Sequence, residues 1–323
     1  MIMEQTPNKN RQHKEVITII ILSLIFMGSG FFLSRQNDPL QLATSLNLND
    51  SDQVEKAINA EQERIARAKR RFLSNINLEA KAYIVYNPET GEIITSSNEN
   101  KVLPLASLTK VMTVLATSEK LPPEANVTIR EDIGQNSSGF FGGERWQMAN
   151  LRALTLVSSS NEGAKALAEA ITDSENLVLL MNKKAQDLNL SSLQFSNPTG
   201  LDDGPLPGGQ GSALEIAKLF TYVIKNKPEI FEPTREAIIV ERSIDGLNHV
   251  AVNTNTIVNQ IPGLMASKTG YTDLAGGNLA VIANIGLHRP LVFVVLGSSK
   301  DGRFSDTKKL TNATLNYYAY INK

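Results

Sequence analysis

The sequence predicts one large domain of mixed α-helices and β-strands, preceded by an apolar N-terminal segment. Residues 279–285 and 291–296 are two short apolar runs, typical of buried strands of one sheet. Residues 151–157 and 163–171 instead read as helices. The part of the chain from residue 75 onward is long enough for one large domain with a proper core.

The apolar segment comes first in the chain. Residues 16–33 are mostly Ile, Leu, Val and Phe, a length near the lower limit for crossing a bilayer. Lys9, Arg11 and Lys14 precede the run, while only Arg35 follows it closely. The positive-inside rule therefore predicts a cytoplasmic N-terminus at residues 1–15, a single-pass anchor in the cytoplasmic membrane at residues 16–33, and an extracytoplasmic remainder. A cleavable signal peptide is the alternative.

Residues 34–74 are expected to form a linker and a charged helical stalk. Residues 36–51 are polar, and residues 52–72 combine a partial apolar stripe with a basic cluster: Arg64, Arg67, Lys69, Arg70 and Arg71. We interpret the helix as a solvated stalk, with contact to lipid headgroups or dimerisation as alternatives. Nucleic-acid binding is not expected, because the net charge is −1 and the cluster lies outside the membrane in this topology.

A hairpin and a helix follow. Residues 82–86 alternate towards a turn at residues 87–91, and residues 92–95 return as a second strand. Beyond Pro104, apolar residues at helical spacing place Lys110 one turn after Ser107. A serine hydroxyl is a poor nucleophile until a base takes its proton, so this pair predicts an activated serine. The lysine must be largely neutral, which requires burial or a nearby positive charge such as that of Lys268.

Two further motifs follow in a fixed order. Ser159-Ser160-Asn161 falls between the two predicted helices, and Lys268-Thr269-Gly270 leads into the apolar strands. Each motif alone is weak, because Ser305-Asp306-Thr307-Lys308 is a second Ser-x-x-Lys. We interpret that second match as the start of the last helix, residues 304–321, with Ser305 as its cap. Only the ordered trio supplies a nucleophile, a loop pair and a strand lysine.

With their flanking stretches, the three motifs resemble the low-molecular-mass penicillin-binding proteins, specifically the serine-type D-alanyl-D-alanine carboxypeptidases. The resemblance runs from about residue 80 to the C-terminus and includes residues 83–91, 104–113, 181–185, 195–201, 253–255 and 268–272. It implies an α+β fold of the penicillin-binding protein and β-lactamase type, in which helices flank an antiparallel sheet. An inserted all-helical lobe would carry Ser159 and Asn161, within a catalytic domain at residues 75–323.

The resemblance also implies a role for each site residue. Ser107 would attack the penultimate D-alanine of a peptidoglycan stem peptide, with Lys110 as general base and Ser159 as proton relay. Asn161 would hold the substrate amide. Lys268 and Thr269 would bind the terminal carboxylate, and Gly270 would leave room for the substrate backbone. The backbone N–H groups of Ser107 and Tyr271 would form the oxyanion hole. β-Lactam antibiotics would acylate Ser107, and no cofactor is implied.

Three alternatives remain beside the carboxypeptidase. A DD-endopeptidase uses the same constellation. A class A β-lactamase adds a glutamate that activates the deacylating water, and no Glu-x-x-Leu-Asn-like segment lies between Asn161 and Lys268. Intact motifs argue against a catalytically silent wall-binding protein. The second motif departs from the family, which more often has glycine in place of Ser160 and Asp-Ala in place of Glu162-Gly163.

Other chemistries lack their residues. The chain has no cysteine, and its three histidines, His13, His249 and His288, lack the spacing of a His-Glu-x-x-His zinc site, so no metal centre is expected. Spacing alone leaves a Ser-His-Asp triad open, although we expect His249 and His288 to be strand-edge residues. Only about fifty residues follow Gly270, enough for two strands and a helix. We therefore expect the N-terminal anchor to replace the C-terminal membrane attachment of well-known family members.

Overall fold

The computed structural model describes residues 51–130, 139–171, 174–286 and 289–322. The chain divides into two units after Arg64, and the unit Ile65–Lys323 contains all three motifs. The predicted membrane segment, residues 16–33, and all but the last residue of the polar linker lie outside the described residues. Within the described ranges, no helix has the length and apolar character needed to cross a membrane.

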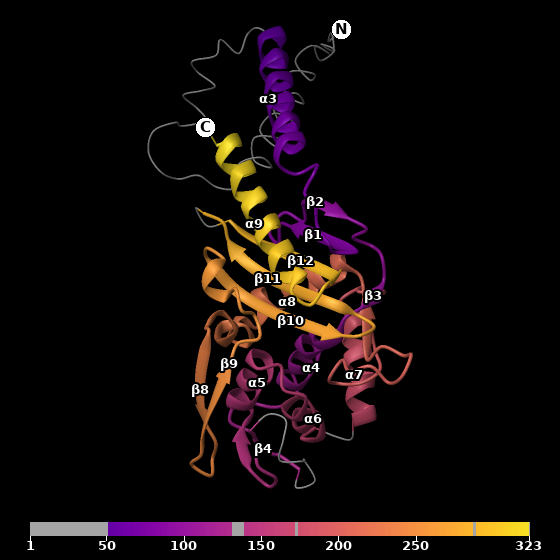
Figure 1. Ribbon diagram of the computed structural model, residues 1–323, viewed down its shortest axis with the longest axis vertical. Helices are drawn as coiled ribbons and strands as arrows, with labels where there is room; N and C mark the ends of the chain where they lie inside the picture. Colours follow the sequence, from indigo (N-terminus) through magenta and orange to yellow (C-terminus); the bar gives the residue numbers. More distant parts are fainter. Residues whose placement is uncertain (1–50, 131–138, 172–173, 287–288, 323) are drawn as a thin grey trace, which may run out of the picture. The chain divides into compact units, whose positions relative to one another are not determined.

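A five-stranded antiparallel sheet organises the second unit (Figure 1). In spatial order its strands are β10 (Leu264–Thr272), β11 (Gly276–Asn284), β12 (Pro290–Ser298), β1 (Ala82–Tyr86) and β2 (Ile93–Ser97). β1 and β2 form the predicted hairpin, and β11 and β12 contain the two predicted apolar runs. β10, which carries the Lys-Thr-Gly motif, is an edge strand, so one side of its backbone has no strand partner.

Helices cover both faces of this sheet. α9 (Gly302–Ile321) packs on one face, where Phe293 and Val295 of β12 meet Leu310 in one apolar cluster. α8 (Ala213–Asn226) packs on the other, where Val292 and Val294 join the larger core. Successive side chains of a strand point to opposite faces, so burial on both faces explains the continuous apolar run of β12.

A mostly helical region lies between the nucleophile segment and α8. Its helices are α4 (Thr109–Ser118), α5 (Met148–Val157), α6 (Asn161–Glu169) and α7 (Ser174–Asp187). It also contains the strand pair β4 (Asn126–Thr128) and β5 (Arg145–Gln147). The remaining described elements are short: β3 (Leu103–Pro104), β6 (Gln194–Phe195), β7 (Gly209–Gly211), β8 (Ile238–Arg242), β9 (Asn248–Val252), η1 (Ala106–Leu108), η2 (Pro228–Ile230), η3 (Glu232–Arg235) and η4 (Val258–Gln260).

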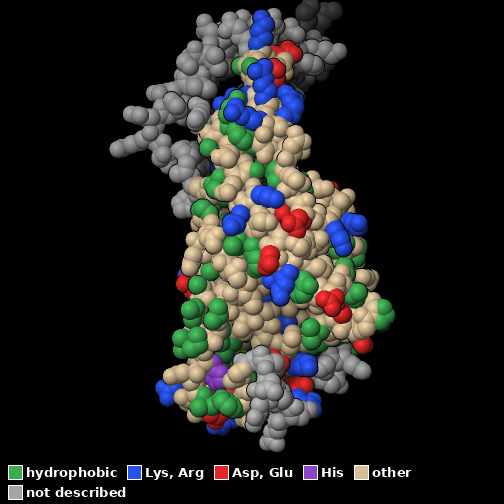
Figure 2. All heavy atoms as spheres, in the orientation of Figure 1, with side chains coloured by type: hydrophobic (Ala, Val, Ile, Leu, Met, Phe, Trp, Pro, Cys, Tyr) green, Lys and Arg blue, Asp and Glu red, His purple; other side chains and the backbone are tan. Residues whose placement is uncertain are grey.

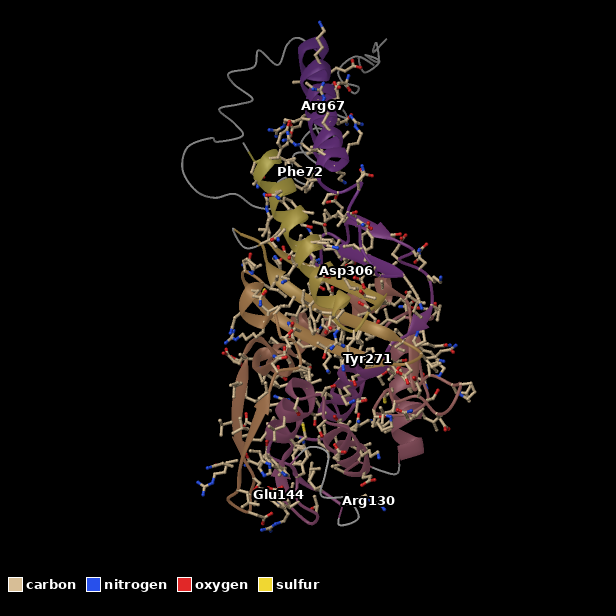
Figure 3. The ribbon with its side chains drawn as sticks, viewed as in Figure 1. Arg67, Phe72, Arg130, Glu144, Tyr271 and Asp306 are labelled. Carbon is tan, nitrogen blue, oxygen red and sulfur yellow. The ribbon has the colours of Figure 1, made fainter. Side chains whose placement is uncertain are left out.

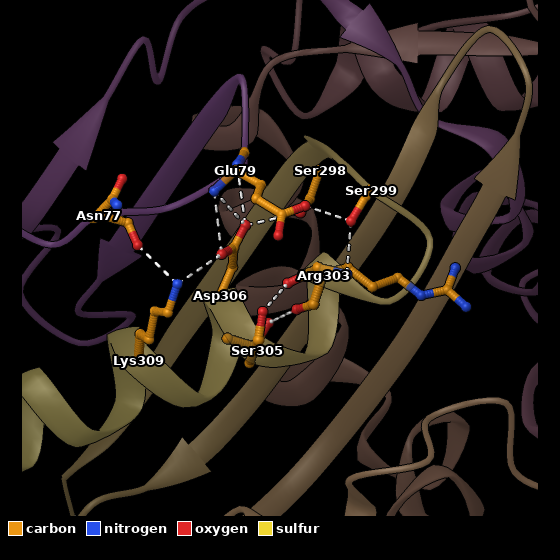
Figure 4. A network of polar contacts seen from close by, with 11 residues as sticks. Asn77, Glu79, Ser298, Ser299, Arg303, Ser305, Asp306 and Lys309 are labelled. Atoms are coloured by element: carbon orange, nitrogen blue, oxygen red, sulfur yellow. Dashed lines mark hydrogen bonds and ion pairs between the residues drawn. The ribbon is translucent and has the colours of Figure 1, made fainter.

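Asp306 on α9 ties the last helix to the entry of β1 (Figure 4). Its fully buried carboxylate accepts hydrogen bonds from the backbone N–H groups of Glu79 and Ala80 and from the Ser298 hydroxyl. The interpretation of Ser305 as the helix cap is wrong. α9 begins at Gly302, whose N–H donates to Ser299 Oγ, and Ser305 donates within the first turn to the Gly302 carbonyl.

The charged helix is α3 (Ser51–Phe72), close to the predicted residues 52–72. Its residues from Ile65 onward belong to the second unit, where Ala68 is buried and the centre of the Phe72 ring lies 5.7 Å from that of Tyr320 on α9 (Figure 3). Arg71 lies over both rings, and Lys69 forms an exposed ion pair with Glu92. Lys69 and Arg71 of the predicted basic cluster therefore make contacts within the second unit.

The β8–β9 hairpin presents an apolar face to solvent (Figure 2). Ile238 pairs with Val252 and Val240 with Val250, and these four side chains are 58–65% exposed. His249 lies on the other face of the same hairpin, in contact with Glu144, Phe140 and Trp146.

Candidate active site

The nucleophile segment bends sharply before α4. Ala106 has a left-handed backbone with φ of 50°, which costs energy for a residue with a side chain, and it opens the short helix η1 that carries Ser107. Gly200 packs directly behind it: a Cβ at that position would lie 2.0 Å from the Ala106 carbonyl oxygen. The segment around residue 200 therefore holds the bend that places the half-buried Ser107 in front of α4.

Lys110 joins residues from three separate parts of the chain. Its Nζ donates to Ser107 Oγ at 2.9 Å, to Asn161 Oδ1 at 2.8 Å and to the Thr199 carbonyl at 2.7 Å. The side chain is fully buried. A neutral amine can donate to Asn161 and Thr199 and still accept the proton of Ser107, so the geometry suits a base.

Burial lowers the pKa of Lys110 to about 7, against the raising effect of the Glu162 carboxylate. Of the two causes that the sequence left open, burial therefore dominates. We expected the charge of Lys268 to lower the pKa of Lys110, whereas the structure shows the charge of Lys110 lowering the pKa of Lys268. The pKa of Lys268 is held well below its usual value first by burial and then by the charges of Lys110 and Arg303.

The second motif occupies the junction between α5 and α6. Ser159 has a left-handed backbone with φ of 61°. Ser160 caps α6 by accepting the Gly163 N–H at 2.9 Å, and Asn161 is the first residue of that helix. Gly163 leaves room for α5, since a Cβ there would lie 2.2 Å from Thr155 Oγ1. The two departures from the family pattern thus have local explanations in capping and helix packing.

The third motif lies on the edge strand β10. Lys268 is buried, and its Nζ donates to Ser159 Oγ at 2.8 Å and to the Thr269 carbonyl at 2.9 Å. Thr269 Oγ1 lies 2.6 Å from Thr254 Oγ1. Gly270 is needed for a reason that the sequence did not indicate. A Cβ at this position would lie 2.7 Å from the Leu105 carbonyl and 3.1 Å from Ser107 N, so β10 packs against the nucleophile segment itself.

The predicted residues thus form two hydrogen-bonded groups. Lys110 bonds to the side chains of Ser107 and Asn161, and Lys268 bonds to the Ser159 side chain and the Thr269 carbonyl. Tyr271, one residue beyond the motif, is 42% exposed (Figure 3). The two groups form a buried site of amine and hydroxyl groups, in which Lys268 and Thr269 can donate hydrogen bonds to an anionic substrate end.

Sequence reasoning gave no role to Thr199 and Thr254. The Thr199 carbonyl is presented by a turn in which Asn197 Oδ1 accepts the N–H groups of Thr199 and Gly200, so the predicted turn at residues 197–200 also completes the Lys110 contacts. A backbone acceptor leaves no mark in a sequence. Thr254 lies in a stretch that resembles the family, and that likeness was the one available signal for it.

The histidines and acidic residues were also compared with the three motifs. No cluster of three His, Asp or Glu side chains in the described ranges could hold a metal ion. His249 Nε2 lies 2.7 Å from the buried Glu144 carboxylate, away from the Tyr271 end of β10 (Figure 3). His13 and His288 lie outside the described residues.

Comparison with known proteins decides the family. The peptidase S11 family model, described as D-alanyl-D-alanine carboxypeptidase, matches residues 68–300. The chain belongs to the D-alanyl-D-alanine carboxypeptidase family. Among relatives, it is 29% identical over 255 residues to the D-alanyl-D-alanine carboxypeptidase DacF of Bacillus subtilis, covering 76% of this chain and 64% of that protein. It is 32% identical to the D-alanyl-D-alanine carboxypeptidase DacA of Haemophilus influenzae, and the match covers 72% of this chain and 60% of that protein.

A solved structure has the same architecture as this member of the D-alanyl-D-alanine carboxypeptidase family. Penicillin-binding protein D2 of Listeria monocytogenes, in a cefotaxime-bound form, has a TM-score of 0.65 at 26% identity, covering 74% of this chain and 98% of that one. The predicted α+β fold of the penicillin-binding protein type is therefore confirmed. The chain spans less than two thirds of the length of the Bacillus and Haemophilus relatives.

Proposed function

We propose that the chain is a serine D-alanyl-D-alanine carboxypeptidase that trims peptidoglycan stem peptides in the cell wall. The observation that carries this is the buried Lys110 amine, which contacts Ser107 Oγ and Asn161 Oδ1 and has a pKa lowered to about 7. Family membership supports the reaction type, and these contacts place the Ser107 nucleophile beside a base whose pKa of about 7 leaves a substantial neutral fraction at physiological pH.

In the proposed mechanism, Ser107 Oγ loses its proton to Lys110 Nζ and attacks the carbonyl of the penultimate D-alanine. The N–H groups of Ser107 and Tyr271 would stabilise the oxyanion. Ser159, held by Lys268, would pass a proton to the leaving amine, so that the terminal D-alanine departs and an ester on Ser107 remains. Water then hydrolyses the ester. Asn161 would hold the substrate amide, and Lys268 and Thr269 its carboxylate.

The test is the intact mass of the full chain, purified in detergent, after brief exposure to a penicillin, with Ser107→Ala as control. Release of D-alanine from a stem pentapeptide is measured in parallel. A lasting adduct and D-alanine release, both lost in Ser107→Ala, would support the proposal. Hydrolysed penicillin without an adduct would indicate a β-lactamase. Cleavage of cross-linked dimers without D-alanine release would indicate an endopeptidase, and inertness in every assay a silent wall-binding protein.

We also propose that residues 16–33 anchor the enzyme in the cytoplasmic membrane, with residues 1–15 in the cytoplasm and the catalytic domain outside. The support is the apolar run and the basic residues before it. The N-terminal sequence of the membrane-bound protein tests this. A mature chain beginning near Gly30 would replace the anchor with a cleaved signal peptide.

A further inference from the structure

Arg303 is a buried cation that the proposed mechanism does not use. It lies in the first turn of α9 and is 8% exposed. In the described part of the chain, no carboxylate forms an ion pair with it, and Asp301 acts on it only at longer range. Its Nε is buried without a hydrogen-bond partner. Burying a guanidinium without a counter-ion is costly, so this arrangement calls for an explanation.

The side chain is directed towards the active-site strand. In Figure 4 it leaves α9 on the side away from Asp306 and crosses the neighbouring strands. Gly277 of β11 lies against the start of this path, because a Cβ there would lie 2.1 Å from the Ser299 carbonyl oxygen and 3.3 Å from Arg303 Cβ. The guanidinium carbon lies 4.6 Å from the centre of the Phe304 ring, which further restricts its position.

The guanidinium ends on one particular peptide group. Its NH1 donates to the Gly270 carbonyl oxygen at 2.8 Å. That oxygen and the N–H of Tyr271 belong to the same planar trans peptide, so they point in opposite directions. Arg303 approaches past β11, where Gly277 is the register partner of Tyr271. The Tyr271 N–H is therefore directed to the unpaired side of β10.

We propose that Arg303 is a positioning residue for acylation: it fixes and polarises the Gly270–Tyr271 peptide, so that the Tyr271 N–H becomes a stronger donor to the oxyanion. A charged donor on the carbonyl draws electron density from the N–H of the same peptide, and hydrogen bonds in such a chain reinforce one another. This inference rests on the proposed function, because it needs an ester on Ser107.

The test compares the full chain with Arg303→Gln, Arg303→Lys and the control Lys300→Gln. Lys300 Nζ lies 5.4 Å from the centre of the Tyr271 ring, so the control removes a nearby positive charge without removing the bond to the peptide. Each protein is acylated with a penicillin, and the infrared stretch of the Ser107 ester carbonyl is recorded together with the acylation rate. A carbonyl in a weaker oxyanion hole vibrates at higher wavenumber.

We expect Arg303→Gln to raise the ester wavenumber and to slow acylation about tenfold, less than the roughly 10²- to 10³-fold loss on removing a whole donor. Arg303→Lys keeps the charge but not the planar fork, so its wavenumber is expected between the two. Lys300→Gln is expected to match the wild type.

Other outcomes separate this inference from the function beneath it. Wild-type protein that forms no ester would overturn both. An ester with the same wavenumber in wild type and Arg303→Gln would overturn the positioning role alone. Slower acylation that recovers at saturating penicillin, with an unchanged wavenumber, would also overturn the positioning role and mean that Arg303 binds the carboxylate of the penicillin directly. If Arg303→Gln does not fold, an unchanged wavenumber in Arg303→Lys would also overturn the proposal.

Discussion

The carboxylate of Glu162 raises the pKa of Lys110, against the much larger lowering effect of burial. Glu162 is the second residue of α6 and accepts a hydrogen bond from the Ser160 hydroxyl at 3.2 Å. The helix that supplies Asn161 to the site therefore also adjusts the proton affinity of the proposed base.

The pH dependence of acylation follows from this. Lys110 accepts a proton only when it is neutral, so the acylation rate of the wild type is expected to rise as pH increases through about 7. Glu162→Gln removes a charge that favours the protonated lysine, so the rise is expected at lower pH. The measurement is the rate of penicillin acylation from about pH 5 to about pH 9.

A matched control for this profile lies on the same helix. Glu169 at the end of α6 pairs with Arg130 at 3.2 Å and does not contribute to the pKa of Lys110. Glu169→Gln should leave the profile in place. A shift to higher pH in Glu162→Gln would show that the carboxylate acts on the site in another way.

Substitutions of Gly200 and Gly204 can separate the cost of a left-handed backbone from the cost of a steric clash. Both have positive φ, 77° and 58°, but a Cβ at residue 200 would overlap the Ala106 carbonyl, whereas a Cβ at residue 204 would meet nothing within 4 Å. Gly204→Ala is expected to lower the free energy of unfolding by about 1 kcal/mol, and Gly200→Ala by clearly more and with loss of acylation. Urea unfolding measures the first effect. Equal losses in both variants would mean that the Ala106 bend does not depend on Gly200.

The buried Glu144–His249 pair is expected to be structural. His249→Leu leaves the Glu144 carboxylate with the Phe141 N–H as its remaining hydrogen-bond donor among the described residues and should lower the free energy of unfolding by about 1.5–3 kcal/mol. Adding Glu144→Leu should recover part of this loss, because both polar partners are then gone. The folded single variant should acylate at the wild-type rate. A rate that falls with His249→Leu would reopen a role for histidine in the reaction.

Thr254 is expected to orient Thr269 for the substrate carboxylate. Thr254→Val removes a hydroxyl 2.6 Å from Thr269 Oγ1 while keeping the shape of the side chain, so kcat/KM for a stem pentapeptide should fall about threefold to tenfold. Thr221→Val on α8 removes a similar hydroxyl, bonded to the Ala217 carbonyl, and serves as control. An unchanged kcat/KM in Thr254→Val would leave Thr269 oriented by its own strand.

The sequence was most informative where one local pattern decides the structure. The apolar runs predicted β11 and β12, and the turn at residues 87–91 predicted the β1–β2 hairpin. The charged helix was placed to within one residue, at Ser51–Phe72. Order and spacing of the three motifs were enough to name the side chains that meet at Lys110 and Lys268, although their roles in the reaction stay predictions.

Features that depend on contacts between distant segments could not be predicted. α9 begins at Gly302, whose N–H donates to Ser299 ahead of the apparent helical pattern, so the prediction of Ser305 as the cap is wrong. The left-handed backbones of Ala106 and Ser159 follow from packing against other elements and not from their own residue type. The contact between Arg303 and Gly270 joins residues on two elements that no motif connects.

The hydrogen bonds between Asp306 and the residues before β1 determine where the C-terminus of a shortened but folded protein can lie. The match to the family model ends at residue 300, just before α9. A protein cut there would retain all three motifs but would leave the N–H groups of Glu79 and Ala80 without their acceptor and expose the apolar side of the sheet that α9 covers. The family match therefore ends before the cooperatively folding unit does. Proteins truncated at the end of the match are expected to aggregate, although they retain the residues of all three motifs.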